Sequence, residues 1–244
     1  MKTKFISLII IILILITNVN AIELTTNTVE LKESNNYWEL VNLIDEYTAN
    51  REKARADAQD ARKAGATEDS VVILNAKSQW NFYNSIIKYY QAQLDKVNEE
   101  LDKVEYKNAT LIWEYMKYLG WNDYVCAGIL GNMMAEVGGG TLDLPYNTKG
   151  NEYYGLCQWN KAYAPTVWDK DLRGQMDFLR QDIVLQLDTY GFCYSYEFNF
   201  EKFLQLENEQ QVAMAFATCY ERCAVNHRYV RQQYATIAYN YFVQ

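Results

Sequence analysis

Apolar residues in the first part of the chain recur at alternating spacings of three and four, which is the pattern of an amphipathic helix. Within residues 28–62 the positions at these spacings are Leu40, Ile44, Tyr47, Arg51, Ala54, Ala58 and Ala61, of which Arg51 alone is charged. Within residues 70–106 they are Ile73, Ala76, Trp80, Tyr83, Ile87, Tyr90, Leu94, Val97, Leu101 and Val104. Two heptad-patterned helices joined by a turn at Gly65 predict a long antiparallel coiled-coil hairpin over residues 28–106. Its expected role is that of a spacer or of an arm for self-association.

The pattern changes after residue 107, where shorter helical segments alternate with polar and glycine-containing stretches. A helix capped by Asn122 or Asp123 is expected to lead up to Glu136. Residues 142–158 are rich in Gly, Asn and Tyr, which indicates a loop and a short hairpin. Further helices are expected over 111–119, 172–187, 200–206, 209–220 and 227–242. The fold class is therefore mainly α, with a small β-hairpin, in a domain spanning residues 108–244.

The N-terminus has the organisation of a secretory signal peptide over residues 1–21. Lys2 and Lys4 precede an apolar run over residues 5–16. That run is shorter than the ~20 residues that cross a membrane. Val19 and Ala21 suit cleavage after Ala21. We expect a secreted or cell-surface protein, with an uncleaved anchor as the alternative.

The composition of the chain argues against nucleic acid as a partner and favours carbohydrate. The 244-residue chain has a formal net charge of -8, which argues against binding the phosphate backbone of nucleic acids. It contains 21 tyrosines. Tyrosine suits carbohydrate recognition, because its flat ring packs on a sugar while its hydroxyl bonds the rim.

The 5 cysteines have two expected uses. Outside the cytoplasm they can form disulfides, and an odd number leaves at least one thiol over. Cys193, Cys219 and Cys223 lie near the C-terminus, and one bridge among these three is expected. Cys126 and Cys157 fall in segments that indicate packing.

One stretch combines helix-forming residues with a single carboxylate. From Gly128 the chain reads Gly-Ile-Leu-Gly-Asn-Met-Met-Ala-Glu and ends at Glu136, before glycines at 138–140 that stop the helix. The negative end of the helix dipole and desolvation by apolar neighbours both favour the protonated carboxyl. That is the form that a general acid needs.

Three blocks in order resemble the phage tail-type lysozyme family, a branch of the lysozyme-like superfamily. They are Gly-Ile-Leu-Gly-Asn-Met-Met-Ala-Glu at 128–136, Tyr-Gly-Leu-Cys-Gln-Trp at 154–159 and Ala-Phe-Ala-Thr-Cys-Tyr-Glu-Arg at 215–222. The resemblance covers residues 111–244 and implies a lysozyme-like fold that cleaves the glycan strands of peptidoglycan. It implies that Glu136 is the catalytic acid. It also implies substrate contacts from Tyr154, Gln158, Trp159 and Tyr220.

The chain departs from the family pattern at two positions. Val137-Gly138 follows the glutamate where many relatives have a serine, which affects the hydrogen bonding expected around Glu136. Cys223 stands where a proline commonly follows Tyr-Glu-Arg, near the back of the site.

The mechanism stays open at this level. A second carboxylate would act as base or nucleophile, and Asp143 and Glu152 are the nearest candidates in sequence. A lytic transglycosylase needs only one glutamate, because the muramyl 6-hydroxyl attacks internally. A sugar-binding or structural module without activity is the remaining alternative.

Other constellations are weaker, and no metal or cofactor is predicted. Cys219, Cys223 and His227 are spaced by four, as in a metal site on one helix face, but a fourth ligand is missing. His227 is the sole histidine, and pairing with Cys126 or Cys157 would suit a peptidase. We expect Glu221 to pair with an arginine, for which Arg173 and Arg222 are candidates.

Overall fold

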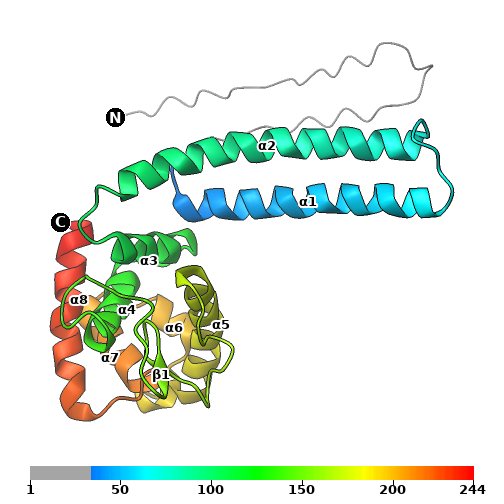
Figure 1. Ribbon diagram of the computed structural model, residues 1–244. Helices are drawn as coiled ribbons and strands as arrows, with labels where there is room; N and C mark the ends of the chain where they lie inside the picture. Colours follow the sequence, from blue (N-terminus) through cyan, green and yellow to red (C-terminus); the bar gives the residue numbers. More distant parts are fainter. Residues whose placement is uncertain (1–33) are drawn as a thin grey trace. The chain divides into compact units, whose positions relative to one another are not determined.

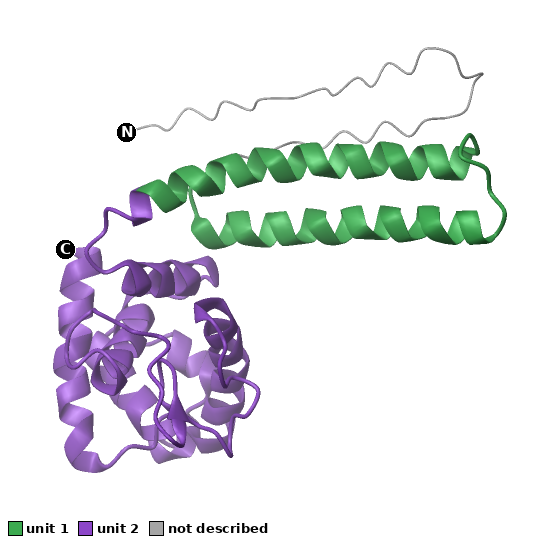
Figure 2. Cartoon of the chain, in the orientation of Figure 1, with its two compact units in different colours: residues 1–99 green, residues 100–244 purple. Residues whose placement is uncertain are grey.

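The computed structural model describes residues 34–244. The predicted signal peptide and the first residues of the predicted hairpin lie outside the described residues. The chain divides into two compact units between Glu99 and Glu100 (Figure 2). No helix within residues 34–244 combines the length and hydrophobicity that a membrane crossing requires.

The first unit is a helical hairpin formed by α1 (Tyr37–Lys63) and α2 (Val71–Leu101) (Figure 1). Leu40 near the start of α1 packs with Ile86, Tyr90 and Leu94 of α2. Ala58 near the end of α1 packs with Ile73 and Ala76 at the start of α2. The two helices are therefore antiparallel, as the heptad pattern predicted.

The ends of these helices follow local capping. The Asn36 side chain accepts a hydrogen bond from the backbone N–H of Glu39, so α1 begins at Tyr37, later than predicted. Gly65 in the turn has a φ of 92°, a conformation that glycine adopts without steric cost. Helix α2 ends at Leu101, earlier than the predicted end at residue 106.

The predicted seam of α2 was wrong at two positions. Ile86 is buried in place of Ile87, and the Trp80 residue is 40% exposed. A straight helix has 3.6 residues per turn and drifts about 20° per heptad against a strict 3.5 repeat, so the buried stripe moves round the helix. Arg51 in the seam of α1 donates to Asn84 Oδ1 at 3.1 Å. Self-association through this hairpin stays a prediction, which sedimentation of the full chain at rising concentration would test.

The second unit is mostly helical with one small β-hairpin, which confirms the predicted fold class. Its elements are α3 (Lys107–Tyr118), α4 (Asp123–Glu136), β1 (Tyr153–Tyr154), β2 (Trp159–Asn160), α5 (Leu172–Tyr190), the 3-10 turn η1 (Gly191–Cys193), α6 (Phe200–Leu204), α7 (Glu209–Cys219), the 3-10 turn η2 (Val225–His227) and α8 (Arg228–Val243). The antiparallel strands pair Tyr153 with Asn160 and Tyr154 with Trp159.

Helix α4 lies at the centre of this unit, and its residues 125–134 are buried. Asn122 caps it by accepting from the backbone N–H of Val125, as predicted. Helices α7 and α8 pack closely on two glycines of α4. A Cβ on Gly128 would lie 2.8 Å from the backbone nitrogen of Ala213, and one on Gly131 would lie 2.4 Å from that of Ala235. The absent side chains therefore set the distance of both helices from α4.

We expect Gly131→Ala to lower the free energy of unfolding, because the new Cβ would clash with the backbone of α8. The higher helix propensity of alanine contributes only about 1 kcal/mol. Overpacking against atoms that cannot move aside costs about 1–3 kcal/mol or more, so destabilisation prevails. Urea unfolding followed by tryptophan fluorescence measures the difference.

Gly150→Ala is the matched control for this substitution. A Cβ at Gly150 meets nothing closer than Tyr153 O at 3.7 Å, and its φ lies outside the left-handed region. Its stability should stay within about 0.5 kcal/mol of the wild type. Equal stability of the two variants would contradict the close approach of α4 and α8.

Candidate active site

Glu136 is the last residue of α4, and the chain reverses directly after it. Gly139 and Gly140 have φ values of 57° and 87°, and the N–H of Gly140 donates to Met134 O at 3.0 Å. These left-handed residues close the helix, which explains why glycines stand there. The reversal leaves the Glu136 side chain at the edge of the core, with an exposed fraction of 20%.

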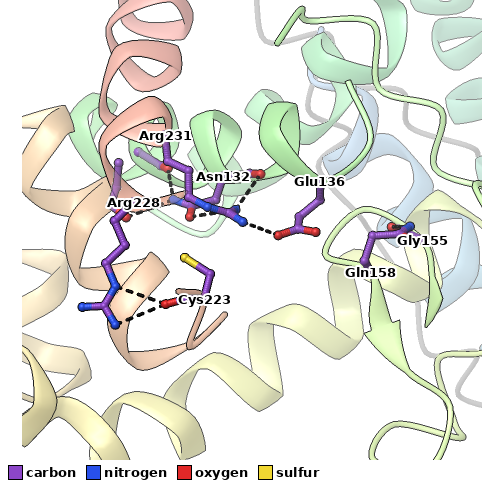
Figure 3. Close-up of polar contacts among 9 residues, drawn as sticks. Asn132, Glu136, Gly155, Gln158, Cys223, Arg228 and Arg231 are labelled. Carbon is purple, nitrogen blue, oxygen red and sulfur yellow. Dashed lines mark hydrogen bonds and ion pairs between the residues drawn. The ribbon is translucent and has the colours of Figure 1, made fainter. Parts of the chain in front are cut away.

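A buried arginine from α8 holds the Glu136 carboxyl. The Arg231 side chain is only 6% exposed, and its Nη2 lies 2.5 Å from Glu136 Oε1 (Figure 3). Arg231 Nη1 donates to the backbone oxygen of Asn132 at 3.2 Å and to its Oδ1 at 3.3 Å. The guanidinium thus joins α8 to two successive turns of α4.

Asn132 itself is fully buried and fixed from the other side. Its Nδ2 donates to Gly128 O at 2.9 Å and to Ala213 O of α7 at 3.1 Å. Because both hydrogens of the Asn132 side-chain amide are donated in these two bonds, its Oδ1 is the atom that accepts a hydrogen bond from Arg231. The polar chain from α7 through Asn132 and Arg231 therefore fixes the orientation of Glu136.

These surroundings differ from those expected from the sequence. The predicted neighbours of Glu136 were apolar residues that favour the protonated carboxyl. The structure instead puts a buried cation in contact with it, with Arg231 Nη2 at 2.5 Å from Oε1. The sequence pattern did not reveal this contact because Arg231 comes from a helix almost a hundred residues downstream.

A second glutamate faces the same group of charges. The pKa of Glu221 is raised to about 8, chiefly by burial and in part by the negative charge of Glu136. Arg231 and a hydrogen bond from the Cys157 thiol act in the opposite direction. Glu221 Oε1 is buried without a hydrogen-bond partner among the described residues, and so is Arg231 Nε.

The partners expected for Glu221 were wrong. Arg173 pairs with Asp177 at 3.8 Å. The Arg222 guanidinium lies over the ring of Tyr190, 4.6 Å from its centroid. Helix α7 ends at Cys219, so Glu221 lies beyond the helix, and the charged groups that affect its pKa are Glu136 of α4 and Arg231 of α8.

The predicted substrate contacts occupy two kinds of position. Tyr154 is 4% exposed, and its hydroxyl donates to Lys170 O at 2.7 Å. Trp159 is 5% exposed, and its indole N–H donates to the hydroxyl of Tyr220 at 2.8 Å. Tyr220 in turn hydrogen-bonds Asp182. These three aromatic side chains anchor the β1–β2 hairpin to the rest of the unit.

Gln158 is the partly exposed member of the predicted set. It has a φ of 44°, and its Nε2 donates to Gly155 O at 2.9 Å. In Figure 3, Gln158 and Arg231 lie on opposite sides of Glu136. The charges of Glu221 and Glu136 reach the neighbouring Cys157 thiol and raise its pKa beyond the effect of burial. The hairpin turn is thus close to both carboxyls.

The remaining candidates do not form a second site. Asp143 and Glu152 are exposed. The three residues of the weaker metal-site alternative, Cys219, Cys223 and His227, are divided between the end of α7, the segment after it and the turn η2. Within residues 34–244 no group of His, Cys, Asp and Glu is arranged to hold a metal ion. All five cysteines are free thiols, so the expected bridge is not formed.

The Cys–His peptidase alternative also lacks support. Burial raises the pKa of Cys126 to about 12 and that of Cys157 well above its usual value. A nucleophilic cysteine needs the opposite shift, because the thiolate is the reactive form. His227 is exposed.

Comparison with known families decides the identity of the second unit. The family model for phage tail lysozyme matches residues 107–242. The chain belongs to the phage tail lysozyme family. Comparison with curated proteins and with solved structures gives no match. Membership of the phage tail lysozyme family indicates a lytic enzyme that acts on peptidoglycan, and the match begins after the helical hairpin.

In the sequence of this phage tail lysozyme unit, Arg231 and Asn132 do not stand out as site residues. Each of the two residues is nevertheless a polar side chain at a position whose neighbours on the same helix face are apolar. Asn132 is the one polar side chain in the apolar run 125–134, and Arg231 shares a helix face with Ala235 and Ala238. A polar residue on a buried face needs a buried partner, but the sequence does not show which residue provides it.

The raised pKa of Glu221 predicts a loss of stability with rising pH. A group whose pKa is higher in the folded state stabilises the fold fully below its ordinary value of 4.5, and this contribution is lost as pH rises through about 8. Glu221→Gln cannot ionise, so its stability should change less over this range. Urea unfolding at several pH values should show the variant gaining a few kcal/mol on the wild type. If the free energy of unfolding changed with pH in the same way for both proteins, Glu221 would not be a buried neutral carboxyl.

Proposed function

We propose that this protein cleaves the bond between MurNAc and GlcNAc in peptidoglycan glycan strands, with Glu136 as the general acid. The observation that carries the proposal is a carboxyl inside the part of the chain that matches the family, partly exposed and in contact with a buried arginine. Glycosidic cleavage requires a proton on the leaving oxygen, and a carboxyl held in one orientation can deliver it.

Arg231 supports this role in two ways. Its contact with Oε1 orients the carboxyl, so that Oε2 can carry the proton toward the glycan. When the proton leaves, Glu136 becomes a carboxylate beside a guanidinium, and this charge is stabilised more than the neutral acid was. An interaction that strengthens as charge develops lowers the barrier.

The β1–β2 hairpin is proposed to present the glycan to Glu136. Gln158 is the side chain in its turn that is both polar and partly exposed, and we propose that it contacts the sugar. Tyr154, Trp159 and Tyr220 are proposed to support Gln158 from behind, because their polar atoms are already hydrogen-bonded within the protein.

Glu136→Gln should reduce cleavage of purified peptidoglycan by a factor of about 10²–10⁴, the usual contribution of a general acid. Turbidity loss of a peptidoglycan suspension measures it. Glu207→Gln is the matched control, because Glu207 is exposed, has no role in the proposed site and undergoes the same change of charge. It should clear the suspension like the wild type. Equal clearing by wild type and Glu136→Gln would refute the proposal.

The products distinguish hydrolysis from transglycosylation. We propose hydrolysis, which yields new reducing ends and consumes one water for each bond cleaved. Mass spectrometry of the released fragments should show these ends. Products with 1,6-anhydro ends would assign the same acid to a lytic transglycosylase. No fragments from the wild-type protein would support a sugar-binding or structural module.

A further inference from the structure

Arg222 is exposed and lies against two tyrosine rings. Its guanidinium carbon is 4.6 Å from the centroid of the Tyr190 ring and 6.0 Å from that of the Tyr163 ring. We propose that these three residues, the Arg222 cluster, form a subsite for a carboxylate on the peptide that peptidoglycan carries on its muramyl sugars. This inference rests on the proposed function and adds a second contact with the same substrate.

A chain of hydrogen bonds connects the Arg222 cluster to the β1–β2 hairpin. The indole N–H of Trp159 in β2 donates to the Tyr220 hydroxyl at 2.8 Å, and Tyr220 hydrogen-bonds Asp182. Asp182 also accepts a hydrogen bond from the Tyr163 hydroxyl at 3.1 Å. Arg222 follows Tyr220 by two positions in the chain. The cluster is therefore attached to strand β2 within the part of the chain that matches the family.

The length of the peptide allows this contact at a distance from the bond that is cleaved. An extended chain spans at most about 3.3–3.6 Å per residue, so a peptide of about four residues reaches on the order of 13 Å from its sugar. Gln158, the proposed sugar contact, directly precedes Trp159 of β2. A glycan bound beside Gln158 thus has its peptide within reach of a surface attached to the same strand.

The Arg222 guanidinium retains its hydrogen-bond donors. Among the residues that the structure describes, none forms an ion pair or a hydrogen bond with its side chain. Burial raises the pKa of the nearby Asp182, and the charge of Arg222 acts against this rise. The Asp182 carboxyl is nevertheless occupied, because Oδ1 accepts from Tyr163 and from Gln186. The planar fork of a guanidinium matches both oxygens of a carboxylate, so Arg222 is suited to bind one from outside.

The cluster is ordered without a ligand. The Tyr163 hydroxyl donates to Asp182 and accepts from Gln186, which fixes a ring that is 50% exposed. Tyr190 ends α5 and supports the guanidinium from its own ring face. Side chains that are held in place before binding lose less conformational entropy when the ligand arrives. The exposed ring of Tyr163 also offers an apolar surface to the peptide beside the cation.

Arg222 occupies a backbone conformation that favours glycine. Its φ is 51°, in the left-handed region, where a side chain is sterically unfavourable. A cation–π contact at an exposed site stabilises only weakly, so the contact with Tyr190 offsets this cost in part. Non-glycine residues in such conformations cluster at active sites and ligand clamps. Binding of a carboxylate gives the arginine a use that glycine could not provide.

The charge of the whole protein makes a fixed cation effective here. The chain has a formal net charge of -8, so a substrate that carries carboxylates is repelled at long range. An arginine without an ionic partner supplies attraction at one defined position. The subsite would therefore select strands whose peptides have free carboxylates over strands in which these groups are uncharged.

The test compares two forms of one substrate, which are soluble uncrosslinked peptidoglycan fragments with free carboxyls and the same fragments after carbodiimide coupling to ammonia. Coupling converts each carboxylate into an uncharged amide. The wild-type kcat/KM, measured by chromatography of the cleaved fragments, should be about tenfold lower on the amidated form, because a charge-assisted hydrogen bond is lost. Arg222→Gln should already be about tenfold lower on the free-carboxyl form, and amidation should change its kcat/KM little further.

Two further variants define the contact. Arg222→Lys keeps the charge but loses the planar fork, so its preference for free carboxyls should lie between those of the wild type and Arg222→Gln. Arg55→Gln is the matched control, because the Arg55 side chain is 63% exposed, lies in α1 outside the family match and undergoes the same change of charge. It should cleave both forms like the wild type.

The possible results separate this inference from the proposed function. Equal cleavage of the two forms by the wild type would overturn the inference and leave the proposed function in place. Loss of activity in Arg222→Gln by the same factor on both forms would assign Arg222 a structural role and would also overturn it. Cleavage of neither form by the wild type would reject the proposed function.

Binding decides the inference even if the protein does not cleave. Calorimetric titration of the full wild-type chain with a muramyl peptide that has free carboxyls should give a Kd about tenfold lower than titration with its amide. Equal affinities, or binding of neither compound, would show that the Arg222 cluster does not recognise a carboxylate.

Discussion

The buried guanidinium of Arg231 is the interaction on which the geometry of this site depends. An arginine with 6% of its side chain exposed requires partners for its hydrogens and for its charge. Asn132 and Glu136 provide both from one helix. Because the five donors of a guanidinium lie in one plane, these partners fix the rotation of α8 against α4 as well as its distance.

Close packing makes this contact possible. Gly131 lets the backbone of α8 approach α4 to a distance that a side chain would prevent. At that separation the Arg231 side chain reaches both Asn132 and the carboxyl at the end of α4. The glycines at 128 and 131 act on the candidate site indirectly, because they let α7 and α8 come close to α4.

Proton transfer would turn the proposed acid, Glu136, into a carboxylate, and a guanidinium in contact with it stabilises that charge. A second carboxyl, Glu221, interacts electrostatically with both groups: burial and the charge of Glu136 raise its pKa, whereas Arg231 acts to lower it.

The sequence by itself determined the elements of the fold. Heptad spacing predicted the antiparallel hairpin, and glycines with capping residues predicted the limits of α4, because these signals are local. The three blocks that resemble the family, with Glu136, Gln158 and Glu221 among them, could also be identified in the sequence. The residues that these side chains contact could not be identified from the sequence. Arg231 joins Glu136 across 95 positions, and Tyr154, Trp159 and Tyr220 are buried by contacts from separate segments. Only tertiary packing decided which charges meet, because side chains far apart in sequence interact only once helices and loops have been brought together.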